Sequence, residues 1–580
     1  MKIKTFSKKF LVGALLLAFA GCETFDLDQT ENPSTLPQSY NDPIQAFNYI
    51  QLQLPDFVNS ANSFTQRVTR QMAMTGGRTY DNAFQPELFD NNWIIGYRIL
   101  NTVKQMEAKA LADQQYRVFG ASKVIRCYVL MTLVDLYGDV PYSEALMGNA
   151  NLTPRYDASE DVYAGVYGEL NDAIAYLQNT AATNEDLAQD IMFGTGEVAA
   201  PDADAWIRVA NSLKLKMLHT ARLTGIQGYD TASEVNALIA GGQLIDSATE
   251  DFAFRYGTER EVPNSRHPDY NNDYEFGGGS YLGNYFMWAV SREKAEPTGG
   301  SYPYFDIRTQ YYFYRQAANS TDTPQNLPCE YFASPEHYGN VIYASFYIPD
   351  AVEAAYCTTD LGGDGTSFWG RDHGDDSGIP QDDETRSAHG LYPAGGKFDY
   401  TASPVANNQG VDGALGEGIM PILLSSFVHF MKAELALTVP GVTGNPAAEL
   451  EAGMRASFEK VTTAMPQQER EPSQSVIDSK VTTYVNFVMT RFNAASAADK
   501  LNILVKEFYI ASWGNGIEPY NNYRRTGYPD NMQPTLEPEP GQYFYTALYP
   551  AIGVNNNPNA PANVRTRKVF WEETAGLDLH

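Results

Sequence analysis

The sequence has few cysteines and few histidines. Of its 580 residues, 4 are cysteine and 7 are histidine. No two histidines have the i, i+4 spacing that is typical of a zinc site on a helix. Cys127 lies in an apolar stretch and is most simply a small buried residue. Cys329 and Cys357 could form a disulfide in an oxidising compartment or remain separate thiols.

The sequence also lacks the signatures of the common enzyme families. No HExxH, GxSxG, P-loop or strand–GxGxxG–helix pattern occurs. A chain with 70 acidic residues always offers carboxylate pairs, so counting them does not identify a glycosidase. We therefore predict that the protein is not an enzyme, and a glycan hydrolase remains the alternative.

Basic residues are scarce relative to acidic ones. Lysine and arginine total 41, and the formal net charge is −29. Residues 1–21 carry four lysines and no acidic residue, so their removal would take the net charge from −29 to −33. Such a chain repels nucleic-acid phosphates and anionic membrane surfaces. We expect no nucleic-acid partner, and membrane attachment only through a lipid or a protein partner.

The N-terminal apolar run is too short to span a membrane. It covers Phe10 to Ala20 and follows a lysine-rich start. Gly21 and Cys22 come next, and this arrangement resembles a bacterial lipobox, in which Cys22 becomes the lipidated first residue. The predicted organisation is a lipoprotein signal peptide over residues 1–21, a flexible tether over residues 22–44 and a single domain over residues 45–580.

One stretch in the first third of the chain is apolar on almost every face. It runs from Val124 to Tyr137, and a helix that is apolar all round is a buried helix. Gly138 should end this helix, and Pro141 favours an extended turn after it. Asp135 should then be a buried carboxylate that needs a cation or several N–H donors.

Helical periodicity recurs before and after this central helix. One helix is predicted from Pro43 through Leu54 and a second over Phe64–Met74. Further helices are predicted over Trp93–Leu111, Ser159–Leu177, Asp202–Leu223, Ser233–Ile239, Ile422–Leu437, Asn445–Met465, Val476–Phe492 and Ala497–Ser512. Their apparent pairing suggests a mainly α fold, in which helix pairs over about 45–250 and 420–530 frame a long loop-rich insertion over about 251–420. No clean repeat of about 34 residues is visible, so the tetratricopeptide-like type of these pairs rests on a family resemblance.

Aromatic residues are abundant, with 38 Tyr, 29 Phe and 6 Trp. Several lie among glycines in the loop-rich insertion. Rings on loops can stack on the C–H face of a sugar or on a peptide side chain, or they can bury the loop against the helices. The predicted ligand-binding residues, from these loops and from an early polar loop, are Tyr281, Tyr285, Trp288, Trp369, Arg78, Tyr80 and Asn82.

The insertion also contains a segment that is dense in glycine and aspartate. Asp360, Asp364 and Asp372 form a candidate calcium site, because calcium binds carboxylate and carbonyl oxygens in flexible loops. The spacing does not match an EF-hand. The alternative is a turn that is held by hydrogen bonds from side chains to the backbone.

Several segments resemble one family. The sequence LYGDVPYSEAL at the end of the central helix resembles the SusD/RagB family of nutrient-binding outer-membrane lipoproteins from Bacteroidetes. The same resemblance extends over Phe368–Tyr400, Gly413–Leu437 and Glu507–Pro529. It implies four tetratricopeptide-like helix pairs that support irregular binding loops. It also implies a lid function on a SusC-like TonB-dependent transporter, with glycans or peptides as ligands.

We therefore expect a surface-exposed lipoprotein that is anchored in the outer membrane through Cys22. It should capture an oligomeric nutrient, most simply a glycan and otherwise a peptide, and deliver it to a SusC-like transporter. The alternatives are a lipid-anchored glycan hydrolase that uses carboxylates of the 360–384 loops, and a scaffold without a ligand. Arg524 and Arg525 should be structural and bond terminal carbonyls or a buried carboxylate such as Asp135.

Overall fold

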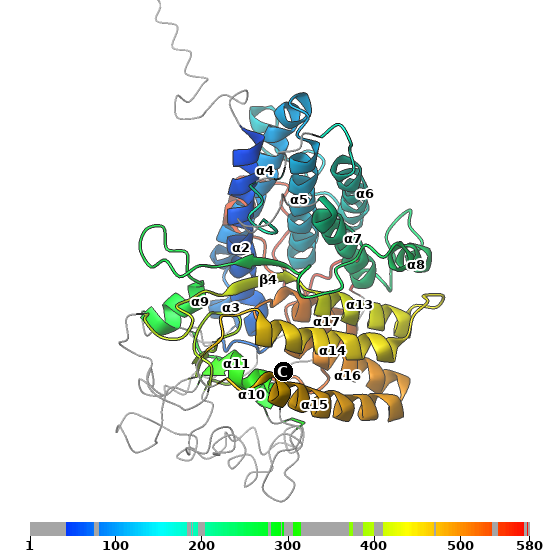
Figure 1. The fold of residues 1–580 in the computed structure, drawn as a ribbon. Helices are drawn as coiled ribbons and strands as arrows, with labels where there is room; N and C mark the ends of the chain where they lie inside the picture. The colour runs from blue at the N-terminus through cyan, green and yellow to red at the C-terminus, as the bar shows by residue number, and fades with distance from the viewer. Residues whose placement is uncertain are drawn as a thin grey trace, which may run out of the picture.

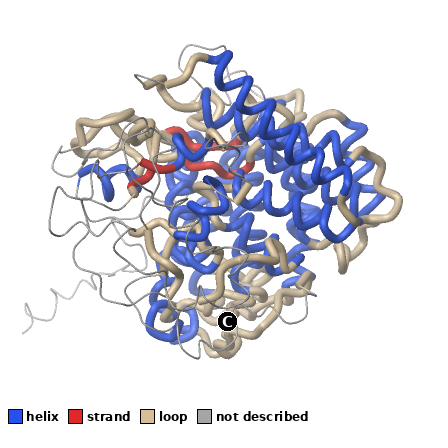
Figure 2. Tube along the Cα trace, turned by 90° about the horizontal axis from the view of Figure 1, so that it is seen from below, coloured by secondary structure: helices blue, strands red, loops and turns tan. Residues whose placement is uncertain are grey.

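A computed structural model describes most of the chain from residue 42 onward. The described residues are 42–74, 80–182, 187, 189–194, 203–275, 280–291, 293–294, 306–314, 370–374, 387–399, 410–468, 471–535, 537, 543–572 and 577, with the backbone alone at 81 and 82. Helices dominate these residues, and the short strands lie among them (Figure 2). The predicted mainly α fold class is confirmed.

The long helices of the N-terminal part pack against one another in chain order (Figure 1). They are α2 (Pro43–Val68), α4 (Asp90–Ala112), α5 (Tyr116–Tyr137), α6 (Ser159–Leu177) and α7 (Ala203–Thr220). Shorter elements connect or follow them: α3 (Tyr80–Ala83), η2 (Pro86–Phe89), η3 (Gly148–Ala150) and α8 (Thr231–Gly241).

Helix α2 is one continuous element where two helices were predicted. The expected break between Leu54 and Phe64 is absent, so that prediction is wrong. Asp42 starts the helix, because its Oδ1 accepts the N–H of Ile44 at 2.9 Å. Pro55 lies inside the helix without ending it. The apolar residues on both sides of this proline are buried, and their packing outweighs the local cost of the proline.

A second group of helices follows the insertion. It consists of α13 (Ser425–Thr438), α14 (Pro446–Thr463), α15 (Gln474–Ala494), α16 (Ala497–Ala511), α17 (Ile517–Thr526) and the short α18 (Ala551–Asn556). Helix α13 contacts α7, and α17 contacts α2, so the two groups share one core. Buried apolar residues from Phe47 to Leu577 form one continuous cluster. Within the described residues, no helix is both long and apolar enough to cross a membrane.

Helix α5 is the buried centre of the first group, as predicted. Every residue from Val124 to Tyr137 except Arg126 is buried. Gly138 ends the helix with a φ of 84°, a conformation that favours glycine.

Asp135 on α5 is fully buried and bound by several donors, as expected for a carboxylate in this helix. Its Oδ1 accepts hydrogen bonds from Tyr163 Oη at 2.5 Å and Trp571 Nε1 at 3.1 Å. Its Oδ2 accepts one from Asn521 Nδ2 at 2.8 Å. Arg524 donates to the main-chain carbonyl of Asp135 at 2.6 Å. Three distant segments are therefore tied to the central helix.

The described parts of the insertion contain short elements. Strand β1 (Phe252–Arg255) pairs antiparallel with β4 (Ile419–Leu423), with Phe254 opposite Met420, and β2 (Phe313–Tyr314) pairs antiparallel with β3 (Ala388–His389). The helices are α9 (Pro268–Tyr270), η4 (Asn271–Glu275), α10 (Asn284–Ser291) and α11 (Arg308–Tyr312). Helix α10 contacts α11 and α16, so it joins the insertion to the second helix group (Figure 1).

Candidate ligand-binding site

The start of helix α10 is held between two other chain segments. The N–H of Gly283 donates to Gln71 O at 3.0 Å, and the N–H of Arg371 donates to Leu282 O at 3.0 Å. A Cβ on Gly283 would lie 2.0 Å from the carbonyl oxygen of Arg70, so only glycine permits this approach. Segments far apart in the sequence are thus fixed beside the predicted aromatic loop.

Two of the predicted rings lie next to or within helix α10 and are partly exposed. Tyr281 precedes the helix and is half-buried, with the Arg371 guanidinium 4.6 Å from its ring centroid. Trp288 lies within the helix and is half-buried, with Lys506 Nζ 5.8 Å from its ring centroid. Cations at these distances help to hold aromatic rings in place. Ligand contact by Tyr281 and Trp288 stays a prediction.

Tyr285 occupies a different environment on the same helix. Its side chain is only 3% exposed. Its hydroxyl donates to Asn531 Oδ1 at 2.9 Å and accepts a hydrogen bond from Lys506 Nζ at 2.7 Å. The ring centroid lies 6.0 Å from that of Tyr509 on α16. In this position Tyr285 packs α10 against α16.

The early polar loop reaches the same region through Tyr80. This residue is buried, and its hydroxyl lies 3.0 Å from Nε2 of His373. His373 belongs to the segment that pairs with the start of α10, so the structure brings Tyr80 and the aromatic loop into one region. Arg78 and Trp369 lie outside the described residues, as does the side chain of Asn82.

Asp372 ties the 370–374 segment to its surroundings. Its Oδ1 accepts hydrogen bonds from Asn284 Nδ2 at 3.1 Å and Gln533 Nε2 at 2.8 Å. The other candidate calcium ligands, Asp360 and Asp364, lie outside the described residues. In the part of the chain that is described, no group of three potential metal ligands occurs. Also outside that part are Cys22, Cys329 and Cys357.

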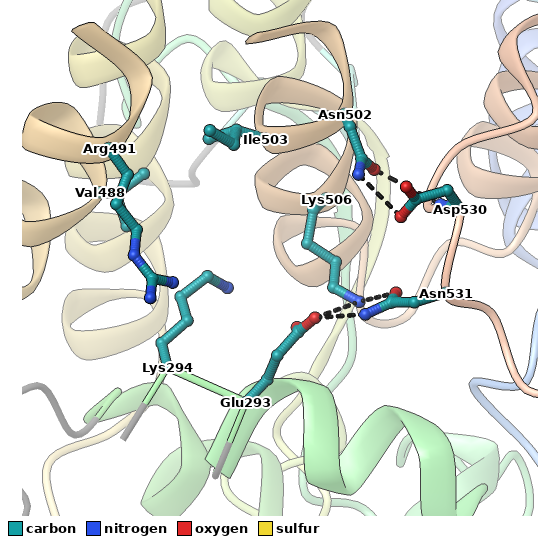
Figure 3. A pocket seen from close by; sticks show the side chains of 9 residues that line it. All are labelled: Glu293, Lys294, Val488, Arg491, Asn502, Ile503, Lys506, Asp530 and Asn531. Atoms are coloured by element: carbon teal, nitrogen blue, oxygen red, sulfur yellow. Dashed lines mark hydrogen bonds and ion pairs between the residues drawn. The ribbon is translucent and has the colours of Figure 1, made fainter. Parts of the chain in front are cut away.

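A pocket of about 120 Å³ lies beside helix α10, between its C-terminal end and helices α15 and α16 (Figure 3). Its lining residues are Glu293, Lys294, Val488, Arg491, Asn502, Ile503, Lys506, Asp530 and Asn531. Sequence analysis missed this pocket because the lining comes from separate segments of the chain. A local signal is Lys506, which together with Glu507 interrupts the apolar residues of the run ILVKEF.

Lys506 is the polar centre of this pocket. Its Nζ donates to Tyr285 Oη at 2.7 Å and Asn531 Oδ1 at 2.8 Å, and it pairs with Glu293 Oε1 at 3.0 Å. Burial lowers the pKa of Lys506, and the nearby carboxylate of Glu293 partly offsets this effect. Burial raises the pKa of Glu293, but Lys506 and Lys294 together bring it below its ordinary value. Glu293 is therefore ionised at neutral pH.

The chain matches two family models. Residues 36–281 match a family described as starch-binding and associating with the outer membrane. Residues 417–548 match a family described as SusD and RagB outer-membrane lipoproteins. A search of curated proteins gives no match.

Several solved structures share this fold. A chitin-binding SusD homologue from Flavobacterium johnsoniae is 17% identical, with a TM-score of 0.59 over 92% of this chain and 98% of that one. A SusD homologue from Bacteroides fragilis is 19% identical, with a TM-score of 0.60 over 92% and 100%. One from Bacteroides uniformis is 16% identical, with a TM-score of 0.61 over 92% and 100%. At such identities the similarity establishes the fold.

Proposed function

Because this chain belongs to the SusD/RagB family of outer-membrane lipoproteins, we propose that it binds an oligomeric glycan at the cell surface. It passes the glycan to a SusC-like TonB-dependent transporter and does not itself cleave it. The lipid on Cys22 anchors the protein in the outer membrane. A chain with a net charge of −29 would otherwise be repelled by anionic lipid headgroups, so attachment depends on the anchor.

Helix α10 and its two partly exposed rings are the observation that carries this proposal. The ring of Tyr281 lies just before this short helix and that of Trp288 lies within it, and the start of the helix is held by main-chain hydrogen bonds. A site that is held in place before binding loses less entropy when the ligand arrives. Sugar rings offer apolar faces that stack on aromatic side chains. One of the structures with this fold is that of a chitin-binding protein, which supports a glycan over a peptide.

A glycan hydrolase receives no support from the described residues. Such an enzyme requires two carboxyl groups on either side of the scissile bond. Asp372 is the described carboxylate of the 360–384 segment, and it is buried with two amide donors on one oxygen. An assay for new reducing ends, with catalytic amounts of protein and mixed polysaccharides, should detect no product.

The binding site can be tested once a glycan array, with a peptide pool in parallel, has identified a ligand. We expect Trp288→Ala and Tyr281→Ala each to weaken binding by about 1 kcal/mol, roughly fivefold in Kd, by analogy with aromatic pair contacts. The matched control is Tyr176→Ala, a half-buried tyrosine on α6 that stacks on Tyr116. Unchanged calorimetric affinity in both site variants, with the fold intact, would place the ligand elsewhere.

The anchor can be tested separately. Labelled palmitate should be incorporated into the wild-type protein in its bacterial host and not into Cys22→Ala. Equal label on both proteins would contradict the predicted anchor. Co-purification of a TonB-dependent transporter with the wild-type protein tests the delivery step.

A further inference from the structure

The pocket beside α10 contains a hydrogen-bond acceptor and donors that are not used within the described structure. Glu293 Oε2 is buried and accepts no hydrogen bond from any described residue. Lys294 Nζ lies 3.0 Å from Glu507 Oε1 as an ion pair, yet it donates no hydrogen bond within the described part of the chain. An ammonium group has three N–H donors, so at least two of them remain. Buried polar atoms of this kind call for a partner.

The other polar groups around this space have partners. Lys506 uses its three donors on Tyr285, Asn531 and Glu293, and Asn531 Nδ2 donates to Glu293 Oε1 at 2.7 Å. Asn502 Nδ2 donates to Asp530 Oδ1 at 2.7 Å. The unused carboxylate oxygen and the unused ammonium donors therefore define what the pocket can bind.

The charges around the pocket favour a neutral guest. The pocket is lined by charges of both signs. An anion would be repelled by the carboxylates of Glu293 and Asp530. A cation would be repelled by the cationic groups of the lining, which are Lys294, Arg491 and Lys506. A neutral group that both donates and accepts a hydrogen bond meets both requirements. A secondary amide is such a group, because its N–H donates and its carbonyl accepts.

The size and walls of the pocket favour an amide that ends in a methyl group. The pocket is small, with a volume of about 120 Å³. Val488 and Ile503 give the pocket an apolar side, which lies away from Glu293 in Figure 3. An acetamido group offers an N–H for the Glu293 oxygen, a carbonyl for the Lys294 ammonium and a methyl for the apolar side of the pocket. A peptide bond lacks this terminal methyl, because the chain continues on both sides of it.

We propose that this pocket is a subsite for the acetamido group of an N-acetylated sugar within the bound glycan. The amide N–H donates to Glu293 Oε2, the carbonyl accepts from Lys294 Nζ, and the methyl contacts Val488 and Ile503. The neighbouring Trp288 stacks on a sugar ring of the same chain. This inference rests on the proposed glycan-binding function and adds the substituent that the glycan carries.

The test is calorimetry on the full chain with three probes: a β-1,4-linked trimer of N-acetylglucosamine, the corresponding trimer of glucose, and trialanine. We expect the acetylated trimer to bind at least about tenfold more tightly than the glucose trimer, because only its amide satisfies both pocket groups. Glu293→Gln replaces an acceptor oxygen with a donor or forces the side chain to turn. It should remove most of this preference.

The matched control is Glu449→Gln, which alters a partly buried acid that pairs with Lys432 at 2.9 Å outside the pocket. It should leave the preference for the acetylated trimer intact. If Glu293→Gln unfolds at a lower temperature than this control, Ile503→Phe takes its place. The larger ring fills the pocket and should abolish the same preference.

The outcomes separate the subsite from the proposed function. Equal binding of the two sugar trimers, unaffected by Glu293→Gln, overturns the subsite and leaves glycan binding in place. Binding of neither trimer also overturns the subsite, and the glycan array then decides the function independently. Tighter binding of trialanine than of either trimer contradicts both the subsite and the glycan assignment.

Discussion

Arg525 on α17 should contribute strongly to stability and little to ligand binding. Its guanidinium is buried and bonds Glu434 on α13, with Nε 3.1 Å from Oε1 and Nη2 2.8 Å from Oε2. Nη2 also donates to Asn522 Oδ1 at 2.9 Å. Arg525→Ala therefore removes the partner of a carboxylate that has no access to water. Removal of one member of a buried ion pair costs about 3–5 kcal/mol.

The lower end of this range applies here because Glu434 keeps other partners. Arg222 Nε lies 2.9 Å from its Oε1, and His219 Nε2 lies 2.8 Å from its Oε2. We expect a loss of about 3 kcal/mol in the free energy of unfolding. With an unfolding entropy of about 2.1 cal/mol/K per residue, this loss lowers the thermal midpoint by about 3 °C.

The loss should also depend on pH. Burial, followed by repulsion from Arg525, lowers the pKa of His219 to about 4, compared with 6.5 ordinarily. In the wild type, the unfolded state therefore binds a proton at His219 below pH 6.5 that the folded state does not bind. The stability of the wild type decreases as the pH is lowered from 6.5 toward 4. Arg525→Ala removes part of the repulsion, and a protonated His219 can then pair with Glu434. The deficit of the variant should shrink as the pH falls from 6.5 toward 4.

Urea unfolding at pH 8 and pH 5.5, followed by circular dichroism, measures both effects. The control is Arg455→Ala, which breaks an exposed i, i+4 pair with Glu451 and should change stability by less than about 0.5 kcal/mol. Affinity for the identified glycan should stay within about twofold of wild type in both variants. A variant at Arg525 that is as stable as the control, or that loses affinity without losing stability, would refute a structural role.

Two further predictions concern other parts of the fold. Gly283→Ala should destabilise the protein by about 1–3 kcal/mol, because the new Cβ would lie 2.0 Å from a main-chain oxygen. Gly168→Ala on α6, where the new Cβ would lie 3.8 Å from the nearest atom outside the helix, should instead stabilise the protein by up to about 1 kcal/mol. If urea unfolding shows Gly168→Ala to be less stable than Gly283→Ala, this reasoning is wrong. Glu572→Gln should be more stable than wild type at pH 8 and nearly equal to it at pH 4.5. Burial raises the pKa of Glu572 to about 8 and outweighs the opposite effect of the nearby Arg524. Between pH 4.5 and 8 the unfolded chain has therefore released a proton that the folded chain retains, and the wild type loses stability as the pH rises. A constant difference between wild type and variant across this range would refute the buried, protonated state.

Properties that depend on one local pattern were predictable from the sequence. The burial of α5 follows from a run with scarcely any polar face, and its end at Gly138 follows from the residue type. The need of Asp135 for several donors follows from its place in that run. Family-typical segments such as LYGDVPYSEAL indicated the family and its mainly α fold, and the comparisons confirm both.

The identities of long-range partners were not predictable in this way. Nothing near Asp135 in the sequence indicates that Trp571 or Asn521 donates to it, because those contacts exist only after distant segments pack together. Pro55 shows the reverse case, in which a local rule predicts a break and burial on both sides overrides it.

The features of the candidate site also divide into those that local sequence predicts and those that depend on long-range packing. The sequence alone determined that rings and glycines gather near α10, because composition is a local property. Only the tertiary structure decided that Tyr285 packs inward while Trp288 stays partly exposed, and that Glu293 and Lys294 line one pocket with Lys506. Burial and hydrogen bonding depend on which distant residues surround a side chain, and chain order does not specify those neighbours.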